Sequence, residues 1–209
     1  MILFSLYLKK EIPFKNVYLW SMVADSKGVK MSKSKGNVIN PLELVEKYGA
    51  DALRMSLIYG TPAGSKVILS EDKVRAMRNF ANKVWNIGRF INLTFENKKY
   101  IPNKKDHELK ITLNDLITHV QFDLDTFKLN FAAEKIYDFI WNELANKYLE
   151  ENKERIIQQD TAAQMTLLTT YRTCLKLLHP FMPFVTEAIW QENEFLRDNP
   201  LLINSKWPE

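Results

Sequence analysis

The sequence predicts a mainly α-helical fold, with one short extended segment near the N-terminus ahead of an antiparallel helix bundle. Apolar residues recur at three- and four-residue spacing from 109 to 194, and a similar pattern covers 71–95. Helices of this kind bury their apolar faces against one another. The extended segment is 17–20, a β-branched and aromatic run that is typical of a buried strand. Because 46% of the 209 residues are hydrophobic, the chain can form a substantial core.

The first 70 residues predict short elements separated by turns. Residues 1–8 match the end of an amphipathic helix, and Gly28 suits a turn that requires a positive φ. Asn40 is expected to cap one helix, and Asp51 is expected to cap the next. The two helices expected here cover 41–48 and 51–59.

The later helices also carry start and stop signals. Ser70 is expected to cap the long helix, and Asn130 is expected to cap another, while Pro180 ends the helix before it. The polar stretch 98–106 is expected to be a solvated connector rather than an RNA site. The helices expected after residue 70 cover 71–95, 109–127, 131–154, 161–179 and a short stretch that ends near 193.

Composition narrows the class of protein. The single cysteine, Cys174, excludes an internal disulfide and a cysteine-based zinc site. No apolar run approaches the ~20 residues of a membrane span, and the N-terminus lacks the features of a signal peptide, so we expect a cytoplasmic protein. Residues 1–110 hold 20 Lys and Arg against 10 Asp and Glu, whereas 111–209 hold 9 against 15. The basic front half suits a polyanionic partner, although a solvated surface would account for it equally.

The segment with the clearest chemistry is Lys30-Met31-Ser32-Lys33-Ser34-Lys35-Gly36-Asn37. Three lysines within six residues, separated by small residues and closed by glycine, do not fit a core strand. Ammonium groups, hydroxyls and backbone N–H groups presented together suit a polyphosphate, because charge-assisted hydrogen bonds to its oxygens are strong. The helix that follows adds a positive dipole end. Composition alone also allows a lysine-rich surface loop.

The order of residues in this segment resembles the second signature of class I aminoacyl-tRNA synthetases. The flanking stretches, 38–43 and 47–54, resemble the branch that contains the valyl, isoleucyl and leucyl enzymes. Three further stretches most resemble the valyl-tRNA synthetases, and they are Gly60–Gly64, Arg78–Asn86 and Trp207–Glu209. The resemblance covers nearly the whole chain.

The resemblance implies a division of the chain and a role for the signature. Residues 1–40 would be the C-terminal remnant of a Rossmann-like α/β nucleotide-binding domain, 41–70 a helical junction, and 71–209 an anticodon-binding helix bundle. In the family the two signature lysines stabilise the triphosphate of ATP, which implies that Lys30 and Lys33 are catalytic. Mg²⁺ accompanies ATP in the family, and no metal site is expected in this part. The ATP-binding residues implied are Lys30, Met31, Ser32, Lys33 and Ser34.

One feature of the family is missing from the sequence. Class I enzymes also need a His-Ile-Gly-His type motif, and none of His107, His119 and His179 matches it. Their surroundings, a polar loop and two apolar helices, favour structural roles. We therefore expect the C-terminal part of a synthetase that is inactive on its own. The parent reaction would be ATP-dependent activation of valine and its transfer to the tRNA for valine.

The helix over 71–95 carries a polar stripe on the face opposite its apolar positions. Arginine and asparagine can read base edges, and an aromatic ring can stack on an unpaired base. A solvated face, or asparagines that link helices, is the alternative. The candidate RNA-contacting residues are Arg75, Arg78, Asn79, Asn82, Asn86, Arg89 and Phe90.

Two other functions stay open at this point. An isoleucyl- or leucyl-tRNA synthetase would share the signature, and the amino-acid pocket that would decide has no counterpart in these residues. A stand-alone tRNA-binding module would need no catalytic histidines. The sequence leaves the oligomeric state open, although a monomer is the simplest expectation.

Overall fold

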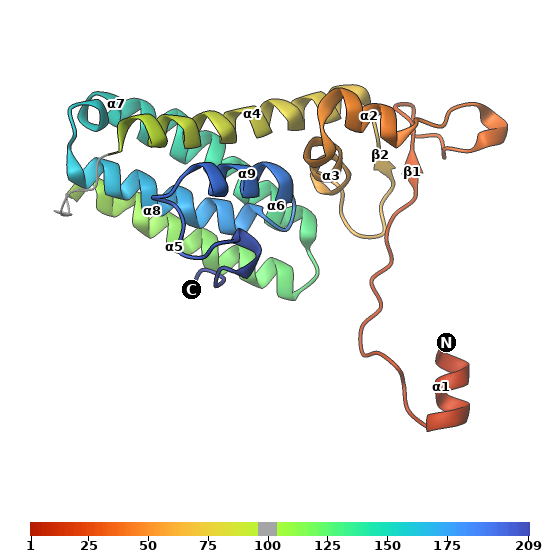
Figure 1. The fold of residues 1–209 in the computed structure, drawn as a ribbon. Helices are drawn as coiled ribbons and strands as arrows, with labels where there is room; N and C mark the ends of the chain where they lie inside the picture. The colour runs from red at the N-terminus through yellow and green to blue at the C-terminus, as the bar shows by residue number, and fades with distance from the viewer. Residues whose placement is uncertain (96–103) are drawn as a thin grey trace.

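The computed structural model describes residues 1–95 and 104–209, with side chains from 106 onward in the second range. It is mainly helical, as the sequence predicts (Figure 1). The polar connector expected over 98–106 lies largely outside the described residues, and its last three residues belong to a helix. No helix in the described ranges has the length and apolar character needed to cross a membrane.

The N-terminal region contains one confirmed prediction and one error. Helix α1 (Ile2–Lys9) forms where expected, but it buries none of its residues and stands apart from the other helices in Figure 1. The buried strand expected over 17–20 is wrong, because this segment has no strand and Leu19 is 74% exposed. The strands are instead β1 (Val23–Ala24) and β2 (Val67–Ile68), which pair in parallel. An apolar run needs a neighbouring strand to become part of a sheet, and in the described chain only the shorter segment has one.

Two short helices follow, α2 (Pro41–Tyr48) and α3 (Ala50–Ile58). The Asn40 cap is confirmed, because its side chain accepts a hydrogen bond from the N–H of Leu42. The Asp51 cap is wrong: Gly49 is at the cap position, and Asp51 lies inside the first turn of α3.

The carboxylate of Asp51 caps a different helix. It accepts hydrogen bonds from the N–H groups of Phe184 (3.3 Å) and Val185 (2.6 Å), at the start of α9 (Pro183–Glu192). Nearby, Arg54 of α3 donates to the carbonyl oxygens of Pro180 and Phe181. These contacts join the region of the signature loop to the end of the bundle.

Helix α4 (Glu71–Thr94) extends from α2 at one end to α7 at the other in Figure 1. The Ser70 cap is confirmed, because its hydroxyl accepts from the N–H of Lys73 at 3.3 Å. Its apolar face is buried against the remaining helices. The buried residues of α4 are Val74, Met77, Phe80, Val84, Ile87, Gly88 and Ile91.

The rest of the bundle is continuous for much of its length. The helix expected over 131–154 is confirmed as part of one long helical stretch. Helix α6 (Leu129–Asp138) passes into the π-helical turns of η2 (Phe139–Leu149) and then into α7 (Glu150–Ile157) without leaving helical backbone angles. The Asn130 cap is wrong: Asn130 is buried in the first turn, and its amide donates to Glu134. The other elements are α5 (Lys104–Asp125), α8 (Thr161–Leu178) and the short 3₁₀ turn η3 (Leu202–Asn204).

Part of the core lies where α4 meets α8 and α9. Tyr171 is fully buried, and its hydroxyl donates to the carbonyl oxygen of Val84 at 2.5 Å. Gly88 allows α8 and α9 to pack closely against α4. A Cβ at that position would lie 3.0 Å from the hydroxyl of Tyr171 and 2.7 Å from a methyl group of Ile189. Cys174 is buried here too, as an apolar filler. The resulting framework holds the exposed face of α4 in a fixed place.

Candidate functional site

The signature segment begins on a β-hairpin. The N–H of Asp25 donates to the carbonyl oxygen of Val29 (2.9 Å), and the N–H of Met31 donates to that of Val23 (3.2 Å). Gly28 completes the turn with φ 74°, as the sequence predicts. Because the first strand of the hairpin is β1, which pairs with β2, the backbone of Lys30 is attached to the body of the protein.

The centre of the segment is a single 3₁₀ turn, η1 (Lys33–Lys35), which Gly36 ends with φ 63°. The hydroxyl oxygens of Ser32 and Ser34 are 3.3 Å apart on this turn. The side chain of Met31 packs against the hydrophobic core instead of facing the turn. Of the expected ATP-binding residues, Met31 can therefore offer mainly its backbone.

The lysines of the segment project into solvent. Lys30, Lys33 and Lys35 are all exposed, and no carboxylate of the described chain forms an ion pair with them. Their charges are therefore available to an external polyanion. Lys30 is on the hairpin strand, whereas Lys33 and Lys35 are on the 3₁₀ turn, so the two expected catalytic lysines have different supports.

The contacts of Asn37 were not expected from the sequence. Its side-chain amide donates to a carboxylate oxygen of Asp25 (2.8 Å) and to the carbonyl oxygen of Lys30 (3.3 Å), and its oxygen accepts from the N–H of Ser32 (3.0 Å). The hydrogen bonds from Asn37 and from the N–H of Val29 lower the pKa of the Asp25 carboxyl, which keeps it ionised. An asparagine directly after the glycine that ends a loop was the available signal, but sequence spacing does not identify its partner.

The carboxylates beside the loop each have a partner within the chain. A hollow of about 530 Å³ separates the loop from the start of α4, and its acidic residues are Asp25, Glu71 and Asp72. Each already has a partner: Glu71 binds Lys47 and Tyr48, and Asp72 binds Arg75. Within the residues described, no group of three or more potential ligands gathers for a metal.

Part of the polar stripe faces a groove between α4 and the η2–α7 stretch. This groove, of about 400 Å³, is lined by amide groups, by the partly exposed ring of Phe90, by Lys83, and by Lys153 with its ion-pair partner Glu150 at 3.8 Å. Lys83 donates to the side chain of Asn146 at 2.7 Å and lies 4.5 Å above the ring centre of Trp141. The asparagines in the groove are Asn79, Asn82 and Asn86.

The three arginines of the stripe lie outside this groove. Arg75 pairs with Asp72, and Arg78 donates to the carbonyl oxygen of Lys47 at 3.4 Å. Arg89 borders a smaller hollow between α4 and α9, together with Asn193. The structure therefore brings four of the seven candidate RNA-contacting residues together and separates the other three from them.

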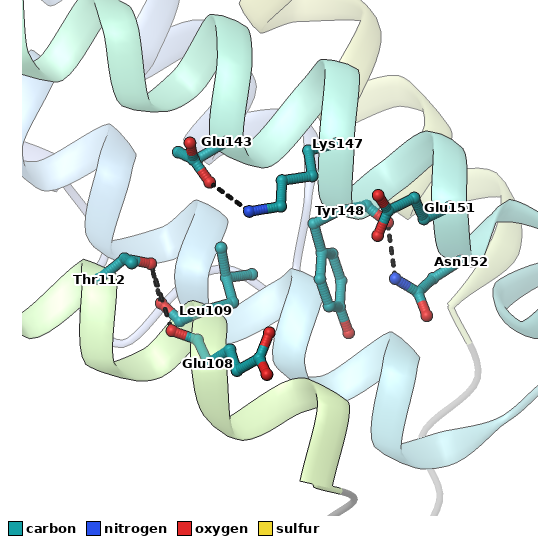
Figure 2. Close-up of a pocket in the computed structure, with 8 residues that line it drawn as sticks. All are labelled: Glu108, Leu109, Thr112, Glu143, Lys147, Tyr148, Glu151 and Asn152. Carbon is teal, nitrogen blue, oxygen red and sulfur yellow. Dashed lines mark hydrogen bonds and ion pairs between the residues drawn. The ribbon is translucent and has the colours of Figure 1, made fainter.

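A further cavity has the opposite charge. It measures about 270 Å³ and lies between α5 and η2, with Glu108, Glu143 and Glu151 around it (Figure 2). Lys147 is paired with Glu143 at 3.2 Å, which leaves a net negative lining. This surface repels a polyanion, so the basic loop and the α4 groove are the better candidates for nucleotide and nucleic-acid contacts.

Two family models match the chain. Residues 1–70 match the model for tRNA synthetases class I (I, L, M and V), and residues 106–209 match the model for the anticodon-binding domain of tRNA ligase. The chain belongs to the class I tRNA synthetases. The signature loop falls within the first matched range, and the stretch that faces α4 across the groove falls within the second.

Individual relatives agree with this assignment. The synthetase chain is 41% identical to a valine–tRNA ligase of Clostridium tetani over its full length, and 41% identical to one of Petrotoga mobilis over 95% of its length. Among solved structures, the LeuRS of Agrobacterium radiobacter in a ternary complex with tRNA and LeuAMS matches 94% of the chain with a TM-score of 0.78 and 27% identity. The chain spans about a quarter of the length of each of these proteins.

Proposed function

We propose that this chain is the part of a valine–tRNA ligase that supplies the signature loop and the anticodon-binding bundle. The observation that carries the proposal is the loop itself, which presents three ammonium groups without an ion-pair partner among the described residues, one on the hairpin and two on the 3₁₀ turn. The identity of about 41% to valine–tRNA ligases, against 27% to the LeuRS structure, favours valine over leucine as the amino acid. The proposed parts are 1–40 for the end of the catalytic domain, 41–70 for the junction and 71–209 for the bundle.

The loop would act during activation of the amino acid. A carboxylate oxygen of valine forms a bond to the α-phosphorus of ATP, the bond from that phosphorus to the bridging oxygen breaks, and pyrophosphate leaves with the bonding electrons. Negative charge grows on the leaving group as this happens. The ammonium groups of Lys30 and Lys33 would stabilise that charge, with Ser32 and Ser34 as further donors. The remaining parts of the active site would come from outside these residues.

The bundle would bind the tRNA. The groove beside α4 offers hydrogen-bonding amides, an aromatic ring and the ammonium group of Lys83, a combination that suits unstacked bases. Lys153 lies in the same lining, paired with Glu150. Asn79, Asn82, Asn86 and Phe90 are the residues proposed to meet bases. Arg75, Arg78 and Arg89 would lie along the backbone at the edges of that contact.

Amino-acid-dependent exchange of pyrophosphate into ATP tests the proposal. A synthetase of full family length that contains this chain should support exchange with valine and much less with isoleucine or leucine. The same enzyme should aminoacylate the tRNA for valine. Exchange that depends on leucine or isoleucine would assign the chain to a neighbouring branch, and no exchange with any amino acid would leave only a tRNA-binding role.

The single buried cysteine is consistent with a reducing cytoplasm for this enzyme.

A further inference from the structure

Asn37 closes the signature loop at its base. Its carboxamide contacts three places: the turn at Asp25, the carbonyl of Lys30 before the loop and the N–H of Ser32 inside it. These contacts span 12, 7 and 5 residues of sequence, so one side chain joins both ends of the loop to the hairpin.

Few other interactions hold the loop in place. Within 32–36 the remaining hydrogen bonds are two backbone bonds of the 3₁₀ turn, Lys35 N–H to Ser32 and Gly36 N–H to Lys33, and the contact between two serine hydroxyls. All of these lie inside the loop, and no residue from 31 to 37 is buried. Met31 anchors the start of the loop on the hydrophobic core, but within 32–36 only the hydrogen bonds of Asn37 connect the turn to the hairpin.

We propose that Asn37 is the positioning residue of the lysine loop, and that its carboxamide sets the place of Lys33 relative to Lys30 before ATP binds. This role rests on the proposed function of the loop. Lys30 is held by the hairpin, whereas Lys33 is on the turn that Asn37 attaches. The ammonium groups of Lys30 and Lys33 must reach the same triphosphate. The hydrogen bonds of Asn37 would keep the two groups at a separation that allows this.

The hydrogen-bonding pattern requires an amide opposite a carboxylate. Asp25 accepts from Asn37 with one oxygen and from the N–H groups of Lys27 (3.0 Å) and Val29 (2.9 Å) with the other. Asn37→Asp would place two carboxylates 2.8 Å apart, and Asp25→Asn would place two amide donors against each other. The double variant, with both exchanges, restores one donor and one acceptor across the same gap. In place of the weaker contact to the carbonyl of Lys30, it sets a carboxylate oxygen against that carbonyl oxygen.

Trypsin digestion of the 209-residue chain tests the attachment without any assumption about function. Trypsin cleaves after lysine, and a detached turn would expose the bonds that follow Lys33 and Lys35. We expect both single variants to be cleaved in the loop several times faster than the parent chain, and the double variant to return close to the parent rate. Asn16→Asp is the matched control, because it makes the same chemical change at an exposed position outside the loop and the hairpin. Equal cleavage of the parent and the two single variants would overturn the attachment.

Kinetics of the enzyme of full family length test the positioning role. Misplacement of a catalytic group by about 1 Å can cost on the order of 10²-fold, so Asn37→Asp should lower the rate of pyrophosphate exchange by ~10- to 100-fold. The loss should fall on kcat and on the KM for ATP, with the KM for valine unchanged, and the double variant should recover most of it. Full exchange activity in both single variants would contradict the role. If the parent enzyme exchanges no pyrophosphate, the proposed function fails, and the digestion result still decides whether Asn37 attaches the loop.

Discussion

The signature loop and the helix bundle are stabilised in different ways. No residue from 31 to 37 is buried, and hydrogen bonds from one asparagine place the loop. Helix α4 instead buries seven residues, among them Phe80 and Val84 with no exposed surface. The groups proposed to act on ATP therefore contribute little buried surface to the fold. Changes in the loop should alter chemistry and leave stability intact, while changes in the buried core of the bundle should lower stability.

The largest effect on stability is expected at Phe80. Its ring is fully buried and lies 4.5 Å from that of Tyr137 between ring centres, so Phe80→Ala leaves a cavity. We expect the free energy of unfolding to fall by about 3–5 kcal/mol. Chemical denaturation followed by circular dichroism measures it. Leu93→Ala on the same helix is the control, because Leu93 is 76% exposed and should change stability little. Similar losses at the two positions would mean that the bundle does not have the core described here.

A smaller effect is expected at the α4 groove, and it should be on RNA affinity. If Asn82 and Phe90 meet bases, alanine at either position should weaken binding of the tRNA for valine by ~1–3 kcal/mol, with a smaller loss for a tRNA with another anticodon. Filter binding of both tRNAs at several salt concentrations measures this difference. Arg89→Ala, outside the groove, should weaken both tRNAs alike and lower the salt dependence.

Asn92 provides the control for the groove. It is exposed on α4 and borders the smaller hollow beside Arg89 instead of the groove. Asn92→Ala should leave the preference between the two tRNAs unchanged. If the groove variants lose affinity for both tRNAs equally, the anticodon site lies elsewhere on the bundle.

The smallest effect is expected on the pH dependence of stability, at Asp51, which joins α3 to the start of α9. Burial raises the pKa of its carboxyl, against the lowering effect of its hydrogen bonds from Val185 and Phe184. Because the folded state then binds its proton more tightly than the unfolded state, this group favours folding most at a pH below its ordinary value of 3.8. That contribution is lost as the pH rises through the raised value.

Replacement of Asp51 by asparagine tests whether its carboxyl group stabilises the fold more at low pH than at high pH. Asp51→Asn keeps an acceptor oxygen for the start of α9 and cannot ionise. The stability of the parent chain relative to the variant should therefore decline as the pH rises from 3.8, and denaturation curves at several pH values measure the difference. A difference that grows with pH would show that the hydrogen bonds outweigh burial.

The elements predicted correctly are those whose signals lie close together in sequence. Asn40 and Ser70 cap the helices that directly follow them, and Gly28 sits in the turn that needs it. Asp51 has partners 133 and 134 residues away, so local capping rules placed it at the wrong helix. The run at 17–20 has the composition of a strand but no neighbouring strand in the described chain.

In the candidate site too, features that depend on the local sequence were predicted, and features that depend on distant partners were missed. The residue types of the loop indicated polyphosphate chemistry, because exposed lysines with hydroxyls act through their own groups. The attachment by Asn37 depends on a partner 12 residues earlier, which spacing does not reveal. On α4, helical periodicity placed Asn82 and Arg89 on one polar stripe with Phe90 beside it, but only the packing of η2 and α7 against the helix separates Asn82 and Phe90 from Arg89.

The most direct measurement of the central claim is the rate of valyl-adenylate formation in a synthetase of full family length that contains this chain. Lys30→Ala and Lys33→Ala should each lower the pre-steady-state rate by about 10²–10³-fold, with valine binding and the melting temperature nearly unchanged, because each lysine meets charge that grows in the transition state. Lys27→Ala, an exposed lysine in the turn of the same hairpin, should keep the parent rate. Parent-like rates in the Lys30 and Lys33 variants would contradict the assignment of the loop to ATP and leave it a structural part of the hairpin.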